Sequence, residues 1–124
     1  MKYTVNTDGG SRGNPGPAAI GAVIKDQNQN TTELSHYLGT ATNNIAEYTA
    51  VLYSLDYLKN LEKNGTCETE VEYILDSELV VKQLTGIYKI KEPSLITLAN
   101  QIKLLSTNFK KVSYQHVKRE FNKH

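Results

Sequence analysis

The chain has 124 residues, of which 39% are hydrophobic and 22% are charged, and these values are typical of one globular domain spanning residues 1–124. No stretch approaches the roughly 20 apolar residues of a membrane span, we expect no signal peptide, and Cys67 has no second cysteine for an intrachain disulfide, so we predict a cytoplasmic protein. The net charge of +1 excludes a strongly basic protein. Six of the seven charged residues from Lys103 to His124 are basic, however, and these basic residues either form a solvated surface or flank a phosphate backbone.

The first 38 residues predict a meander of three strands. Residues 2–8 alternate in polarity and end at Asp8, residues 9–17 are rich in Gly and Pro and predict a loop, and residues 18–25 are a continuous apolar run. A polar turn then leads into residues 31–38, which we expect to form a third, antiparallel strand.

From Asn43 onwards the spacing of apolar residues changes from that of a strand to that of a helix. Ser77 is placed to cap a later helix that Gly86 ends, and Pro93 is placed to start another. We therefore predict a helix, a strand, two helices and a final strand, at residues 43–60, 70–76, 77–86, 93–105 and 109–117.

The order βββαβααβ predicts an α/β layer fold. The first strand, the first helix and the fourth strand form a crossover unit, which favours parallel pairing of those two strands. Asp8 and Asp76 then lie at the same, carboxyl edge of the sheet, where ligands bind in open α/β sheets. Glu47 lies in the opening turns of the crossover helix. If the fold gathers these three carboxylates, they suit Mg²⁺ and the hydrolysis of a phosphodiester.

Each acid also has a purely structural explanation. Asp8 precedes two glycines and could make a turn, Asp76 could cap the helix that follows it, and Glu47 stands three residues after Asn44, the spacing of a capping box. The glycine-rich segment after Asp8 lacks the spacing of a nucleotide-binding loop, but its backbone could approach a nucleic-acid strand closely because glycine has no side chain. Only convergence of the three acids would favour the metal site.

Four blocks of the sequence resemble those of type 1 ribonuclease H, in the order and spacing of that family: Thr7–Pro17, Asn43–Tyr48, Asp76–Val80 and His116–Asn122. The compact archaeal and bacterial branch, which lacks the extra basic helix, is the most similar. The resemblance implies an α/β ribonuclease H-like fold with a five-stranded mixed sheet in the order 3-2-1-4-5, in which strands 1–3 are antiparallel. It also implies endonucleolytic cleavage of the RNA strand of RNA–DNA hybrids with two Mg²⁺ ions, which Mn²⁺ can replace.

The resemblance assigns roles to individual residues. Asp8, Glu47 and Asp76 match three of the four carboxylates that bind metal and act in catalysis, and His116 matches a mobile histidine that assists product release or proton movement. From the pattern alone, His116 would be a surface histidine at a strand end. The residues implied to contact the hybrid are Gly9, Gly10, Ser11, Asn14, Thr42, Asn43 and Asn44. Short polar side chains and loop amides suit the wide, shallow minor groove of a hybrid.

Residues 88–91 either flank the hybrid or form a solvated loop. The fourth carboxylate of the family would fall just beyond His124, and the closing helix of the family would follow it. We therefore expect truncation or natural shortening with impaired activity, unless Asn122, the terminal carboxylate or a partner chain supplies the ligand. The alternatives are a module of the same fold that binds hybrid without cutting it and, more weakly, a metal-dependent DNA-strand nuclease or transferase. We expect a monomer with no membrane partner and no obligate protein partner.

Overall fold

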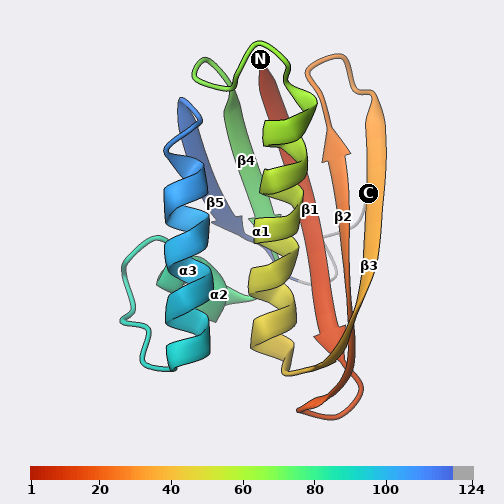
Figure 1. Cartoon of the computed structure of the whole chain (residues 1–124), viewed down its shortest axis with the longest axis vertical. Coiled ribbons are helices and arrows are strands. Elements are labelled where there is room, and N and C mark those ends of the chain that lie inside the picture. Colours follow the sequence, from red (N-terminus) through yellow and green to blue (C-terminus); the bar gives the residue numbers. More distant parts are fainter. Residues whose placement is uncertain (119–124) are drawn as a thin grey trace.

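The structure, a computed structural model, describes residues 1–118 and has the element order βββαβααβ (Figure 1). The strands are β1 Lys2–Ser11, β2 Gly16–Lys25, β3 Thr31–Ala41, β4 Glu70–Leu75 and β5 Lys111–His116. The helices are α1 Asn43–Leu61, α2 Glu78–Leu84 and α3 Pro93–Ser106. None of these helices, within residues 1–118, has the length and apolar character needed to cross a bilayer.

The five strands form one mixed sheet in the order β3-β2-β1-β4-β5, which confirms the predicted fold. β1 pairs antiparallel with β2, and β2 pairs antiparallel with β3, whereas β1 with β4 and β4 with β5 are parallel. The carboxyl ends of β1, β4 and β5 therefore lie at one edge of the sheet.

One face of the sheet packs against α1, and α1 packs against α3 beside it (Figure 1). Side chains alternate along β1, so that Tyr3, Val5 and Thr7 are buried while Thr4 and Asn6 are only partly covered. Tyr48, Val51, Leu55 and Leu58 of α1 are fully buried against these strands, at the helical spacing that the sequence predicted. This packing holds α1 rigidly over the central strand.

Side-chain caps begin two of the helices. The Ser77 hydroxyl accepts a hydrogen bond from the Val80 amide at 3.3 Å, as predicted for α2. α1 is capped by Thr42, whose hydroxyl accepts from the Ile45 amide at 3.2 Å. The alternative explanation of Glu47, as part of a capping box that starts at Asn44, is therefore wrong, because the helix begins before Asn44.

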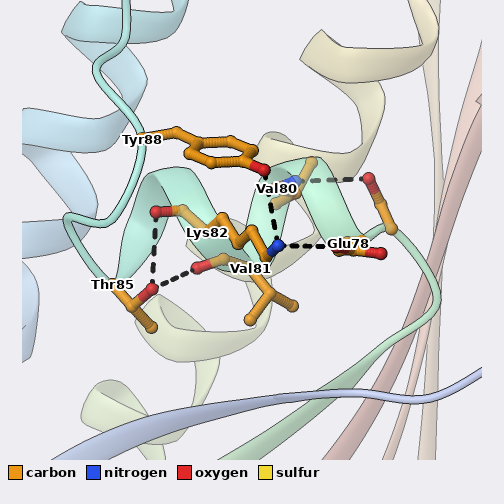
Figure 2. Close-up of polar contacts among 7 residues, drawn as sticks. Glu78, Val80, Val81, Lys82, Thr85 and Tyr88 are labelled. Atoms are coloured by element: carbon orange, nitrogen blue, oxygen red, sulfur yellow. Dashed lines mark hydrogen bonds and ion pairs between the residues drawn. The ribbon is translucent and has the colours of Figure 1, made fainter.

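The segment after α2 is tied back to that helix. Figure 2 shows Lys82 between Glu78 and Tyr88, with its Nζ atom 2.7 Å from the Glu78 carboxylate and 3.3 Å from the Tyr88 hydroxyl. The Lys82 ammonium also lies 5.0 Å from the centre of the Tyr88 ring, a favourable cation–π distance. These contacts anchor the start of residues 88–91, a basic segment that carries Lys89 and Lys91.

The predicted boundaries differ most from the structure in three regions. The loop predicted for residues 9–17 is confined to residues 12–15, which contain a cis peptide bond between Asn14 and Pro15, because residues 9–11 pair with β2 and continue β1. β3 extends beyond Leu38 to Ala41, since its last residues pair with the start of β2. β5 starts at Lys111, later than the predicted 109, because Phe109 belongs to the turn after α3.

Candidate active site

Three acidic side chains from separate parts of the chain line one cleft of about 960 Å³. Asp8 lies near the end of β1, and Asp76 directly follows β4, which is the parallel neighbour of β1. Glu47 comes from the second turn of α1. The crossover from β1 through α1 to β4 thus brings carboxylates that are 29 to 68 positions apart in sequence to the same opening.

A glycine allows α1 to approach β1 this closely. A Cβ atom on Gly9 would lie 2.6 Å from both the carbonyl carbon and the carbonyl oxygen of Ala46, and 2.9 Å from the amide nitrogen of Glu47. Since real Cβ atoms essentially never approach backbone atoms this closely, the two backbones can touch here only when residue 9 is glycine. The contact places Glu47 beside the strand that carries Asp8.

Tyr48, the residue after Glu47, anchors this turn of the helix. Its side chain is fully buried, and its hydroxyl donates a hydrogen bond to the Gln83 side-chain oxygen of α2 at 2.6 Å. Burial, with a smaller contribution from the neighbouring Glu47 carboxylate, raises the pKa of Tyr48 to about 12. Tyr48 therefore stays neutral across the physiological range and holds the Glu47 backbone in place.

The hairpin between β1 and β2 is locked onto the start of α1. The Asn43 side-chain oxygen accepts a hydrogen bond from the Ser11 amide at 2.8 Å, and the Asn14 side-chain oxygen accepts from the Asn43 amide at 3.0 Å. Because backbone amides can only donate, these bonds define which end of each Asn side chain faces the protein. What Asn14 and Asn43 can offer a ligand is therefore their NH₂ groups.

The predicted site residues are not all at the cleft. Gly9, Gly10, Ser11 and Asn43 line it together with the three acids. The other predicted residues, Asn14, Thr42, Asn44 and His116, do not. Asn14 and Thr42 instead support residues that do, through the contacts to Asn43 and to the start of α1.

His116 is the last residue of β5, where it lies opposite Leu75 and is exposed. It therefore stands at the same edge of the sheet as Asp76, which follows Leu75. Asn122 and the terminal carboxylate, which the sequence suggested as substitute metal ligands, lie outside the described residues. The basic segment from Tyr88 is not part of the cleft lining either.

The donor set fits a hard divalent cation, because it consists of carboxylate oxygens. Within residues 1–118, however, no three His, Cys, Asp or Glu side chains already stand close enough together to hold a metal ion. Asp8, Glu47 and Asp76 share the cleft, and their side chains would have to turn toward one another to share an ion. Repulsion between like charges opposes such an approach until a cation neutralises them.

Two residues that sequence reasoning did not select also line the cleft. Arg12, in the β1–β2 hairpin, is the one basic residue in the described lining, and Tyr37 of β3 is the one aromatic residue there. Arg12 lies within the block that resembles the family, so its charge beside Asp8 could have drawn attention. No feature of the sequence singled out Tyr37, because its position depends on the pairing of β3 with β2.

Comparison with known proteins agrees with this geometry. The family model described as "Reverse transcriptase-like" matches residues 6–124. The chain is 41% identical over 124 residues to the "Bifunctional protein Rv2228c" of Mycobacterium tuberculosis, and the match covers 98% of this chain and 33% of that protein. It is 38% identical over 116 residues to "Ribonuclease HI" of Halobacterium salinarum, covering 93% of this chain and 56% of that protein. The chain thus spans between a third and somewhat over half of the length of these curated relatives.

A solved structure extends the comparison to three dimensions. The crystal structure of LC11-RNase H1 in complex with RNA/DNA hybrid matches with a TM-score of 0.89 and 42% sequence identity, over 97% of this chain and 88% of that chain. The similarity in sequence and in fold therefore extends over nearly the whole of this chain. On these grounds the chain belongs to the type 1 ribonuclease H family.

Proposed function

We propose that this protein hydrolyses the RNA strand of RNA–DNA hybrids in a Mg²⁺-dependent reaction. The observation that carries the proposal is that Asp8, Glu47 and Asp76 line one cleft, together with Gly9 and Gly10 near the end of β1. These three residues would hold the metal, which Mn²⁺ can replace. Bound divalent ions supply Lewis-acid stabilisation of the negative charge that develops at the phosphate, and the family pattern calls for two of them.

Residues in the cleft, and Asn14 beside it, would bind and orient the hybrid. The Asn43 and Asn14 amide groups can donate to acceptors in the minor groove, since their oxygens are held by backbone amides. The backbone of Gly9, Gly10 and Ser11 would allow a strand to approach Asp8 closely. Arg12 would offset the acidic character of the cleft and contact a phosphate.

Further residues at the site would support these contacts. Thr42 and Asn44 would complete the binding surface at the start of α1, where the positive end of the helix dipole favours a phosphate. His116, at the neighbouring strand end, would assist proton movement or product release. We also propose that the protein acts in the cytoplasm and as a monomer; the lone, exposed Cys67 is consistent with a reducing compartment.

For a protein made of residues 1–124 alone, we propose weak cleavage that is stronger with Mn²⁺ than with Mg²⁺. The reason is that these residues match three of the four carboxylates in the family pattern. Adding a C-terminal extension that carries an Asp is expected to raise the rate, and an extension without the Asp is the matched control. Equal rates with and without that Asp would contradict this explanation.

The second candidate is a module that binds hybrid without cutting it. For residues 1–124 taken alone, which match three of the four carboxylates of the family pattern, this candidate stands beside the enzyme. The three acids in one cleft oppose it, because a protein that only binds an anionic nucleic acid gains nothing from gathered negative charge.

One assay separates the two candidates. The protein is incubated with labelled hybrid, duplex RNA or duplex DNA, with Mg²⁺ or Mn²⁺. Cleavage of RNA in the hybrid alone, abolished in Asp8→Asn, supports the enzyme. Binding of hybrid with no cleavage under any condition supports the module and refutes the proposed activity.

A further inference from the structure

Tyr37 projects from the sheet on the face opposite α1. Its side chain is 66% exposed and lines the cleft together with Asp8 and Glu47. The preceding residue, His36, points the other way and stacks on Tyr53 of α1, with the two ring centres 5.3 Å apart. Successive side chains on a strand point to opposite faces of the sheet. The Tyr37 ring therefore stands on the face away from α1, together with the exposed Ala19, its pairing partner on β2.

A β-bulge sets this orientation. Ala18 pairs with Gly39, but the next residue, Ala19, pairs with Tyr37, so that Leu38 is an extra residue on β3. Gly39 has a φ of +81°, a left-handed conformation that favours glycine. Without the bulge, Ala19 would lie opposite Leu38, and every side chain beyond that point would change face. The bulge therefore leaves Leu38 packed in a small apolar cluster and turns Tyr37 toward the cleft.

The surface between Asp8 and Tyr37 carries no large side chain. Asp8 pairs with Gly21, and Ala19, the partner of Tyr37, pairs with Gly10. A Cβ atom on Gly10 would meet its nearest neighbour at 3.6 Å, and one on Gly21 at 3.7 Å, both ordinary contact distances. Unlike Gly9, these two glycines are not required by the packing of the protein itself. They leave a shallow floor with a carboxylate at one side and an aromatic ring at the other.

We propose that Tyr37 is a positioning residue whose ring packs against a sugar of the bound RNA strand, away from the nucleotide that is cut. This inference rests on the proposed function. Two strand spacings of about 4.8 Å and two residues of about 3.4 Å put the Cα atoms of Asp8 and Tyr37 about 12 Å apart. At a rise of about 3.4 Å per nucleotide, the ring reaches the strand a few nucleotides from Asp8.

The contact is with the outside of the strand. In a hybrid the bases are paired and stacked, so an aromatic ring on this open floor meets the sugar and phosphate groups and not the face of a base. A contact so far from the reacting phosphate has the same strength before and during bond cleavage. It therefore contributes uniform binding, which lowers KM and leaves kcat unchanged.

The test measures KM and kcat for the full chain on a hybrid with a defined cut site, made by placing a short run of ribonucleotides within a DNA strand. Tyr37→Ala is expected to raise KM about fivefold with kcat unchanged, because the mutation removes the apolar ring surface that the sugar would cover. Tyr37→Phe is expected to match the wild type, because the ring face and not the hydroxyl makes the contact. Leu104→Ala, which removes a 72% exposed side chain from α3, is the control and is expected to have no effect.

Shortening the hybrid from either end distinguishes a direct contact from a structural role. The ratio of the Tyr37→Ala and wild-type KM values is expected to fall to one when the substrate no longer reaches residue 37. A ratio that is independent of length, or no KM effect on the longest hybrid, would overturn the inference. If cleavage is too slow to give KM, fluorescence anisotropy of labelled hybrids gives the same ratio as dissociation constants.

The result also separates this inference from the proposed function. If the wild type cuts or binds hybrid and Tyr37→Ala behaves like it, the role of Tyr37 is refuted while the proposed function stands. If the wild type neither cuts nor binds hybrid, both are refuted.

Discussion

The contact between Gly9 and α1 leads to a quantitative prediction for Gly9→Ala. The new Cβ atom would lie 2.6 Å from the backbone of Ala46, whereas ordinary contact begins at 3.4 Å, so β1 and α1 would have to separate by about 0.8 Å. Overpacking of this kind costs about 1–3 kcal/mol. Because the displaced backbone includes the Glu47 amide, the two carboxylates at positions 8 and 47 also move apart. A displacement of about 1 Å between reacting groups can lower a rate about 100-fold.

The adjacent glycine provides the control. In Gly10→Ala the new methyl group would meet only the Asn43 side-chain oxygen at 3.6 Å, an ordinary contact, so we expect a free energy of unfolding within about 0.5 kcal/mol of the wild type. Urea unfolding followed by circular dichroism measures both variants, and cleavage of labelled hybrid reports on the site. If Gly9→Ala were as stable as Gly10→Ala, the close approach of the two backbones would be refuted.

Three further predictions concern stability. Burial raises the pKa of Tyr48 and Tyr114 to about 12, and that of Tyr73 beyond its ordinary range, so their neutral forms are favoured in the folded state. In the unfolded chain the pKa of tyrosine is about 10, so the stability that these buried neutral tyrosines contribute is complete below pH 10 and is lost as the pH rises from about 10 towards 12. A urea midpoint that does not change between pH 9 and about 11.5 would contradict this prediction. Thr42→Ala is expected to lower the free energy of unfolding by about 1 kcal/mol and Thr42→Ser to restore it, since either hydroxyl can cap α1, and equal losses in both variants would argue against the cap. Tyr73→Phe removes the buried hydrogen bonds to the Val51 carbonyl and the Ser54 hydroxyl, at a cost of about 1 kcal/mol in urea unfolding, and no loss would show that these bonds contribute nothing net.

Much of the fold was predictable from local sequence patterns and from the general rule for crossover connections. The change from strand to helix spacing after Thr42, the cap at Ser77 and the crossover from β1 to β4 gave the correct element order and sheet topology. The same crossover rule explains why Asp8 and Asp76 lie at one edge of the sheet. The sequence pattern placed Glu47 in the opening turns of the crossover helix but did not fix which end of the sheet it approaches. The resemblance to the family then grouped it with Asp8 and Asp76.

What could not be predicted depends on contacts between distant segments. Local composition indicated a loop at residues 9–11, but pairing with residues 18–20 of β2 continues the strand. The bulge at Leu38, and with it the direction of Tyr37, follows from the register of β3 against β2. The side-chain oxygens of Asn14 and Asn43 bond to backbone amides within the protein, which no sequence pattern reveals.

The most direct test of the account is a titration with Mn²⁺, followed by the electron paramagnetic resonance signal of the free ion. Asp8→Asn, Glu47→Gln and Asp76→Asn each replace one carboxylate by an amide of nearly the same shape, and Glu68→Gln, an exposed acid outside the cleft, is the control. We expect each of the three cleft variants to bind Mn²⁺ more weakly than the wild type, and the Glu68 variant to bind it equally well. If all three bound Mn²⁺ as tightly as the wild type, these carboxylates would not form a common metal site.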